Sequence, residues 1–239
     1  MKRIWIGAGL VIAAVWALPS QAWTSASELD VSKVTGVVIE GEAARIDIAT
    51  DAGAPYKAVL RGRTEGWFSF WYSSWSGNRC ELTGAMTISG SELLVNTGSQ
   101  SWSLFDDDEA CAIELNVNLP AGAAVTIDQK ATMSRLTGDF GTLKVKSHAG
   151  DIVLDGHAGS IDIEGNAVQA RLAFDRVERD ETIAISGNAL NAELSFPSAT
   201  PVDYSVNGNA ALVDSTLAST PGAKPQVRIN GNFLRARIR

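Results

Sequence analysis

Apolar and polar residues alternate over short stretches in the second half of the chain. An alternation of period two is typical of strands, and no apolar stripe of period 3.6 is long enough to indicate a helix. Gly, Asn, Asp and Ser separate these stretches, which predicts strands of about four residues joined by tight turns. The alternating apolar pairs are Leu143 and Val145, Ile152 and Leu154, Ile161 and Ile163, and Ile183 and Ile185.

The same half of the chain contains an internal repeat. Four segments align on a Gly-Asn pair, and two weaker copies precede them. The six copies begin at residues 127, 145, 163, 185, 206 and 229. A period of 18 to 23 residues is too short for a helical-hairpin repeat and fits one turn of a β-solenoid. The sequence therefore predicts an all-β fold, a parallel single-stranded β-helix or β-solenoid in which each 18–23-residue coil pairs with its predecessor.

The Gly-Asn pairs are expected at the corners of the coils. Gly adopts positive φ without steric cost, and Asn tolerates the left-handed region better than most residues. Asn166, Asn188, Asn209 and Asn232 would then stack into a ladder of side-chain amides, or would form a row of ligand contacts. The basic C-terminal segment, with Arg235, Arg237 and Arg239, is expected to protect the last strand edge or to contact a partner.

Residues 23–126 are also rich in strand patterns, and the aligned repeat occupies 127–239. The segment 37–48 resembles a repeat unit with Glu42 in the place of Asn, so the coils are able to continue through the boundary near residue 126. Further strands are expected at 56–61, 85–89, 93–96 and 113–118.

Residues 1–22 have the pattern of a secretory signal peptide. Lys2 and Arg3 precede a run of about 15 apolar residues, which is shorter than the roughly 20 that span a bilayer. Ser20-Gln21-Ala22 provides small residues at a cleavage site. No later apolar run is long enough to cross a membrane, so we expect an exported protein without a stable transmembrane segment, located in the periplasm or at the cell surface.

Export changes the interpretation of Cys80 and Cys111, the only cysteines in the chain. In an oxidising compartment they are expected to form a disulfide. The disulfide would close a loop of about 30 residues and contribute roughly 3–4 kcal/mol in the chain-entropy model. The formal charge of −7 disfavours a general nucleic-acid-binding protein, because such proteins are normally basic.

Several segments together resemble the DUF4097 family of adhesin-like proteins of unknown function. They are the strand Gly36-Val-Val-Ile-Glu-Gly41, the segment 115–128 with its Leu-Pro-Ala-Gly turn, and the Gly-Asp coils at 137–139 and 149–151. The resemblance implies a right-handed, single-stranded β-helix-like fold and an exported or envelope location. It implies no catalytic residues. The Gly-Asn coils and an aromatic insertion depart from the family pattern.

That insertion spans residues 67–75 and holds six aromatic side chains. Aromatic faces stack on sugar rings and provide large contact areas in protein interfaces. The segment is therefore a candidate for binding a glycan or an envelope protein. The alternative that the pattern favours more is a hairpin that caps the solenoid and covers apolar core. Insertion into a lipid interface is a third interpretation. The candidate binding residues are Trp67, Phe70, Trp71, Tyr72 and Trp75.

Two other groups of residues could carry chemistry. Asp106, Asp107, Asp108 and Glu109 form an acidic run that could hold Ca²⁺, although a solvated loop explains it better because the EF-hand spacing is absent. His148 and His157 fall on successive corners, where surface turn positions are expected for both. No other cofactor is expected.

These features favour a non-enzymatic, exported binding or adhesin-like protein. One alternative is a polysaccharide-active β-helix enzyme, which would need paired carboxylates on one face. Asp139, Asp151 and Asp155 are the candidates for that pair. A second alternative is a structural or regulatory envelope protein that binds a partner strand at an open end of the coils.

Overall fold

The computed structural model describes residues 26–65, 84–98, 110–178 and 180–239. Its elements are all strands, so the all-β prediction is confirmed for this part of the chain. No helix among the described residues is long and apolar enough to cross a membrane. The strands are β1 (Ala26–Asp30), β2 (Gly36–Ala49), β3 (Lys57–Glu65), β4 (Ala85–Ser89), β5 (Glu92–Asn96), β6 (Ala110–Asn118), β7 (Ala123–Phe174), β8 (Thr182–Ser195), β9 (Asp203–Ser215) and β10 (Gln226–Ile238).

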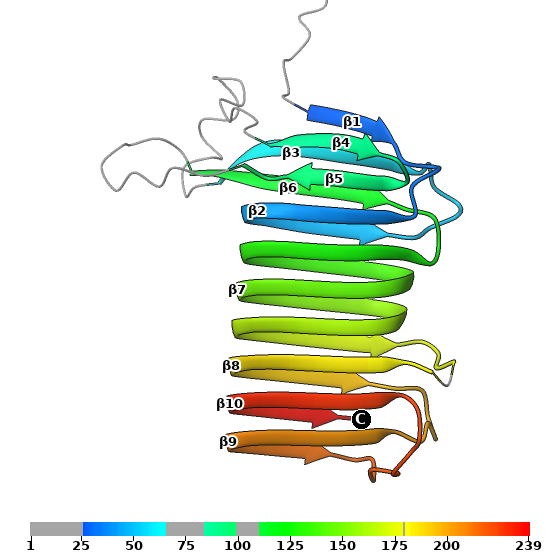
Figure 1. Cartoon of the computed structure of the whole chain (residues 1–239), viewed down its shortest axis with the longest axis vertical. Coiled ribbons are helices and arrows are strands. Elements are labelled where there is room, and N and C mark those ends of the chain that lie inside the picture. The colour runs from blue at the N-terminus through cyan, green and yellow to red at the C-terminus, as the bar shows by residue number, and fades with distance from the viewer. Residues whose placement is uncertain (1–25, 66–83, 99–109, 179) are drawn as a thin grey trace, which may run out of the picture.

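The strands β2, β7, β8, β10 and β9 form a stack of parallel layers along the long axis of the molecule (Figure 1). The long strand β7 contributes several successive layers, and its passes lie above one another with an offset of 18 residues, as Asp139 and His157 show. The strands continue through the Gly-Asn corners, since Gly165 pairs with Gly187 and Ala167 with Ala189. They are therefore much longer than the four-residue strands that the alternation predicts.

The N-terminal end of the stack has a different construction. The first part of β2 pairs with β5 and its second part with β6, both in parallel. Beyond these strands the pairing becomes antiparallel: β4 pairs with β5, β3 pairs with β6, and β1 pairs with β3. Because β2 also pairs with β7 over its length, the stack continues across residue 126.

The order of the last layers differs from the expected one. We expected each coil to pair with its predecessor, but β10 lies between β8 and β9 and pairs in parallel with both. The last layer is therefore β9, and the C-terminal strand is internal (Figure 1). The expectation that Arg235, Arg237 and Arg239 protect the terminal edge is wrong for this reason.

Two rows of side chains explain this order. Val227, Ile229 and Leu234 of β10 are buried. The positions beside Val227 and Leu234 in β9 hold Tyr204 and Ala211, which are half-buried and exposed. The bulkier aliphatic layer thus occupies the interior, where its burial is most favourable.

The second row is charged. Arg237 bonds Glu193 of β8 at 2.7 Å and Asp214 of β9 at 3.4 Å. In the sequential order, Glu193 and Asp214 would lie side by side, and like charges directly opposite one another are destabilising.

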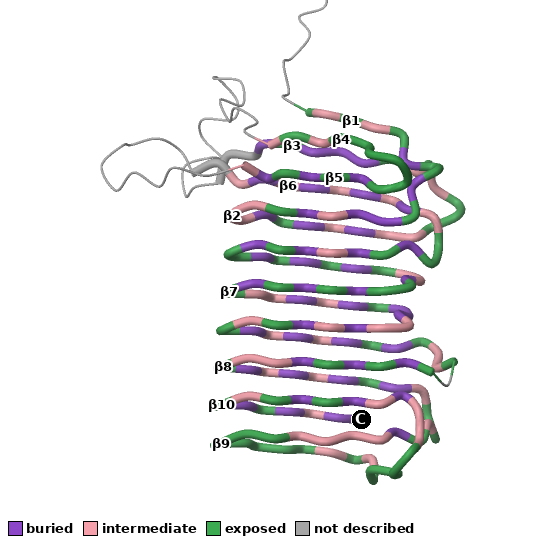
Figure 2. Tube along the Cα trace, in the orientation of Figure 1, coloured by how far each residue is buried: buried purple, intermediate pink, exposed green. Residues whose placement is uncertain are grey.

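The core is a continuous column of inward-facing aliphatic side chains between the two faces of the stack. Figure 2 shows buried positions alternating with exposed ones along nearly every layer. The column of buried side chains ends before the last layer, because the residues of β9 are half-buried or exposed. On the side where the chain passes between layers, the rings of Phe174 and Phe196 stack with centroids 5.0 Å apart.

The Gly-Asn corners do not have the backbone geometry that we expected. The residues with positive φ include Gly41, Gly138 and Gly156, but none of the Gly-Asn pairs of the four aligned repeats. Gly is required there for space, because a Cβ on Gly187 would lie 2.6 Å from the carbonyl oxygen of Gly165 in the next layer. Close stacking of the layers, and not a left-handed conformation, selects glycine at these corners.

Candidate functional site

Most of the candidate residues from the sequence lie outside the described part of the chain. They are the aromatic residues Trp67, Phe70, Trp71, Tyr72 and Trp75, the acidic residues Asp106, Asp107, Asp108 and Glu109, and Cys80. Cys111 is within β6, opposite Thr64 of β3. The disulfide, the Ca²⁺ site and the aromatic binding segment therefore stay predictions.

The structure shows where these segments leave the stack. Glu65, the last described residue before the aromatic segment, pairs with Ala110, the first after the acidic segment. The carbonyl oxygen of Gly98 accepts a hydrogen bond from the backbone N–H of Glu42, at the corner of β2. Both segments thus depart from the side of the stack that carries the Gly-Asn corners.

A row of polar side chains runs along these corners and is called the corner row below. Successive layers contribute Glu42, Lys130, His148, Asn166, Asn188, Asn232 and Asn209. At the N-terminal end, Lys130 Nζ lies 2.5 Å from Glu42 Oε1.

The four asparagines of the corner row are joined by their amides. Asn188 Nδ2 donates to Asn166 Oδ1 at 3.1 Å, Asn232 Nδ2 to Asn188 Oδ1 at 2.7 Å, and Asn209 Nδ2 to Asn232 Oδ1 at 3.0 Å. The structure therefore brings together the residues that the repeat aligns, in the order of the layers and not in that of the sequence. Their amides are engaged with one another along the row.

A polar groove lies beside the corner row and has a volume of about 1500 Å³. Its lining includes Gln129, Ser147 and Asn207. Asn207 donates to Asn230 at 3.2 Å, which adds a second amide contact between the last two layers. Gln129 and Ser147 are buried, and neither Gln129 Oε1 nor Ser147 Oγ has a hydrogen-bond partner in the described part of the protein.

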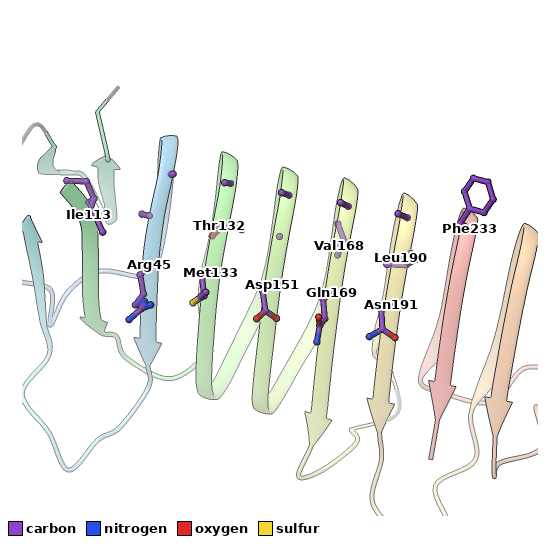
Figure 3. A pocket seen from close by; sticks show the side chains of 18 residues that line it. Arg45, Ile113, Thr132, Met133, Asp151, Val168, Gln169, Leu190, Asn191 and Phe233 are labelled. Atoms are coloured by element: carbon purple, nitrogen blue, oxygen red, sulfur yellow. The ribbon is translucent and has the colours of Figure 1, made fainter. Parts of the chain in front are cut away.

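A second, more apolar groove of about 910 Å³ lies on the other side of the corner row and is called the alanine groove (Figure 3). Its floor holds one small residue from most layers, which are Ala43, Ala131, Ala149, Ala167 and Ala189. Along one rim stand Arg45, Met133, Asp151, Gln169 and Asn191, each from a successive layer. Phe233 of β10, 70% exposed, stands at the C-terminal end of the groove.

The opposite corner of the stack holds a cluster of ionisable side chains. The buried ring of His157 lies between two carboxylates, with Nδ1 3.0 Å from Asp139 Oδ1 and Nε2 3.3 Å from Glu181 Oε1. Arg176 bonds the same Asp139 oxygen at 2.7 Å. The carboxylate of Glu181 also accepts the backbone N–H of Glu178. The prediction that His157 is a surface turn residue is wrong, whereas His148 is exposed as expected.

This environment affects two charges. Burial acts to raise the pKa of Asp139, but hydrogen bonds from His157 and Arg176 outweigh it and lower that pKa below its usual value. The hydrogen bond with Glu178, together with that to Asp139, raises the pKa of Arg176. The cluster fastens the connection before β8 to the β7 corners, since Arg176 and Glu181 belong to that connection.

The acids proposed for an enzyme are mostly engaged in ion pairs. Asp139 contacts His157 and Arg176, and Asp151 receives Arg171 at 2.8 Å. Among the described residues no group of three or more His, Cys, Asp or Glu could hold a metal ion.

Sequence reasoning did not identify the alanine groove or the buried cluster. A signal for the groove was present, because an alanine follows the Gly-Asn pair in three of the four aligned repeats. A signal for the cluster was the 18-residue spacing of Asp139 and His157, which equals one coil. The half-buried Arg176 and the buried Glu181 belong to the connection between β7 and β8, where the sequence has no periodic pattern from which their positions could be predicted.

Comparisons with known proteins give a likeness of fold. No family model matches the chain, and no curated protein matches it. A solved structure described as a "putative cell adhesion protein", from Clostridium sporogenes, superposes with a TM-score of 0.51 at 9% identity and covers 90% of this chain and 98% of its own. A structure described as a "putative adhesin" from Bacteroides fragilis has a TM-score of 0.46 at 9% identity and covers 89% of this chain and 94% of its own. Another with the same description, from Parabacteroides distasonis, has a TM-score of 0.34 at 8% identity and covers 90% of this chain and 98% of its own. At these identities the first likeness shows the fold alone.

Proposed function

We propose that the protein is an exported, non-enzymatic, adhesin-like binding module of the cell envelope, built on a β-solenoid. The parallel layers, the 18-residue offset within β7 and the amide contacts along the corner row support the solenoid description. The resemblance of the sequence to DUF4097 and the fold likeness to a protein described as a cell adhesion protein point in the same direction. The signal-like segment 1–22 supports a periplasmic or cell-surface location.

The alanine groove is the observation that carries this proposal. It crosses the layers from β6 to β10 and presents an apolar floor beside a rim of polar side chains. The aromatic segment leaves the stack from the same side, after Glu65. An extended glycan or an extended segment of an envelope protein fits such a surface, because its apolar face could lie on the floor while the rim hydrogen-bonds its polar edge.

The non-enzymatic part of the proposal rests on the state of the acids. A glycosidase needs a carboxylic acid and a carboxylate that both face the substrate. Asp139 and Asp151 are instead paired with basic side chains of their own chain. This pairing makes them structural groups of the layers.

Glycan-array binding by the mature protein, together with capture from envelope extract, tests the proposal. Ala167→Glu places a charge on the groove floor and is expected to reduce binding at least about tenfold. Ala184→Glu is the matched control, because Ala184 is exposed on β8 outside the groove. A Trp67/Trp71/Trp75 triple Ala variant tests the aromatic segment. Equal binding by the Ala167→Glu and Ala184→Glu variants would contradict the assignment of the groove, and turnover of a polysaccharide would contradict the non-enzymatic proposal.

A further inference from the structure

The last layer of the stack, β9, is protected along only one of its two arms. The connection 216–222 folds back over the first arm, where Thr220 N–H donates to the carbonyl oxygen of Val202 and Ser219 Oγ bonds both backbone groups of Tyr204. Tyr204 Oη donates to the carbonyl oxygen of Leu217 at 3.1 Å. These contacts cover the start of that arm, at Val202 and Tyr204.

The second arm, Ala210 to Asp214, has no such cover. Its inner edge pairs with β10, and the described residues provide no partner for its outer edge. Thr216 N–H donates toward β10, to Ile238, so by strand alternation the backbone groups of Ala211 and Val213 point to the open side. This arm is therefore a short template for another strand.

Apart from the carboxylate of Asp214, its side chains lack the features that normally discourage strand addition. Proteins protect free edges with Lys, Pro, bulges or inward charges. The segment 203–215 contains no Lys, Arg or Pro, and Leu212 and Val213 are 61% and 43% exposed.

The rows of side chains that end at this arm define the strand that would continue them. The inward positions in line with Ala211 and Val213 are aliphatic in the preceding layers of β8 and β10, which hold Leu190 and Ala192, and Leu234 and Ala236. Residues opposite Ala211 and Val213 should therefore be aliphatic as well. The charged row reads Arg171, Glu193, Arg237 and Asp214 across successive layers. Its alternating sign calls for a basic residue opposite Asp214.

We propose that the outer edge of Ala210–Asp214 is a docking site for an extended peptide segment of a partner protein. The segment adds as a parallel strand with the pattern aliphatic–any–aliphatic–basic. Backbone hydrogen bonds to Ala211 and Val213 provide affinity, and the basic residue beside Asp214 sets the register. This site lies at the end of the stack and is independent of the alanine groove, so either assignment could fail without the other.

The peptide with the sequence of residues 232–239 is a suitable probe. It has the required pattern, and the same segment of β10 pairs in parallel with the inner edge of β9, with Leu234 beside Ala211 and Arg237 beside Asp214. Binding of the fluorescent peptide to the mature full-length protein is measured by anisotropy. A peptide with Glu in the place of Arg237 is expected to bind at least about fivefold more weakly, and a scrambled peptide not at all.

Val213→Pro is the decisive variant. It removes an N–H that points to the open side, not to β10, and is expected to weaken peptide binding at least about tenfold. Val213→Lys provides a second test if the proline variant does not fold. Leu94→Lys is the matched control, because Leu94 is 40% exposed on β5, at the other end of the stack and outside both grooves.

The outcomes separate the possible occupants. Loss of binding in both Val213 variants, with retention in Leu94→Lys, supports the proposal. Peptide binding that is unaffected by Val213→Pro would indicate exchange with β10 and overturn it. Dimers of the full chain that disappear in Val213→Pro, without peptide binding, would assign the edge to a second copy and also overturn it. Absence of any peptide binding would overturn it directly.

Discussion

In the Gly-Asn corners, two adjacent residues contribute in different ways to the close stacking of the layers. Glycine allows the backbones of neighbouring layers to approach, and asparagine joins the layers through its amide. The sequence could predict the asparagine contacts, because an aligned repeat places its residues in register. It could not predict why glycine is needed, because close packing and positive φ both select glycine and only coordinates distinguish them.

Gly187→Ala is expected to destabilise the protein. Its Cβ would lie 2.6 Å from the carbonyl oxygen of Gly165, and backbone atoms on both sides would have to move. We expect a loss of about 1–3 kcal/mol in the free energy of unfolding, measured by denaturant titration. Gly36→Ala is the control, since its Cβ would meet Ala124 at an ordinary 3.5 Å. Equal stability of the two variants would contradict the packing explanation.

Asp139 is expected to make stability depend on acid pH. Its folded-state pKa lies below the unfolded value near 3.8, so its contribution is complete above that value and is lost as pH falls through the lower, folded-state pKa. Asp139→Asn should therefore flatten the decline in melting temperature between about pH 5 and pH 2. Asp162→Asn, at a half-buried aspartate of β7, is the control. Parallel pH profiles of Asp139→Asn and the unmodified protein would contradict this role.

At the scale of strands, the charged row decides which layer lies next to which. β8, β9 and β10 carry the same Gly-Asn motif in the same register, so backbone pairing alone permits either order. The hydrophobic pattern is also similar in the three strands. The sequence therefore predicts the existence and register of these strands, but their order depends on differences in side-chain size and charge that the repeat pattern does not rank.

Arg237→Glu is expected to destabilise the C-terminal layers. It would place three acidic side chains side by side, at Glu193, residue 237 and Asp214, where ion pairs now occur. A loss of about 1–2 kcal/mol is expected, larger at low salt because the charges are partly exposed. Arg235→Glu is the matched control, since its neighbours in the row are Asn191 and Leu212. Thermal unfolding at low and high salt measures both variants, and an equal effect would argue against the charged row.

At the scale of the whole molecule, the repeat predicted the direction in which the layers stack, and the grooves follow from geometry that it does not contain. The alanine groove needs alanine at one corner position of successive layers from β2 to β8, and Phe233 at that position in β10 ends it. The polar groove needs the inward turn of Gln129 and Ser147 where later layers have glycine. Such surfaces depend on the lateral register of whole layers, which alternation within one strand does not define.

The order of the layers can be tested with pairs of cysteines in the corner row. Asn188 and Asn232 are neighbours, as are Asn232 and Asn209, whereas Asn188 and Asn209 are separated by a layer. Adjacent strands lie about 4.8 Å apart, so two layers give about 9.6 Å, beyond the reach of a disulfide. We therefore expect Asn188→Cys/Asn232→Cys and Asn232→Cys/Asn209→Cys to form a disulfide under mild oxidation. Asn188→Cys/Asn209→Cys should not form one.

Peptide mapping by mass spectrometry distinguishes these bonds from any that involve Cys80 and Cys111. A rapid 188–209 disulfide would instead show that the layers follow the sequence, with β10 outermost, and would remove both the interior position of Arg237 and the open edge of β9.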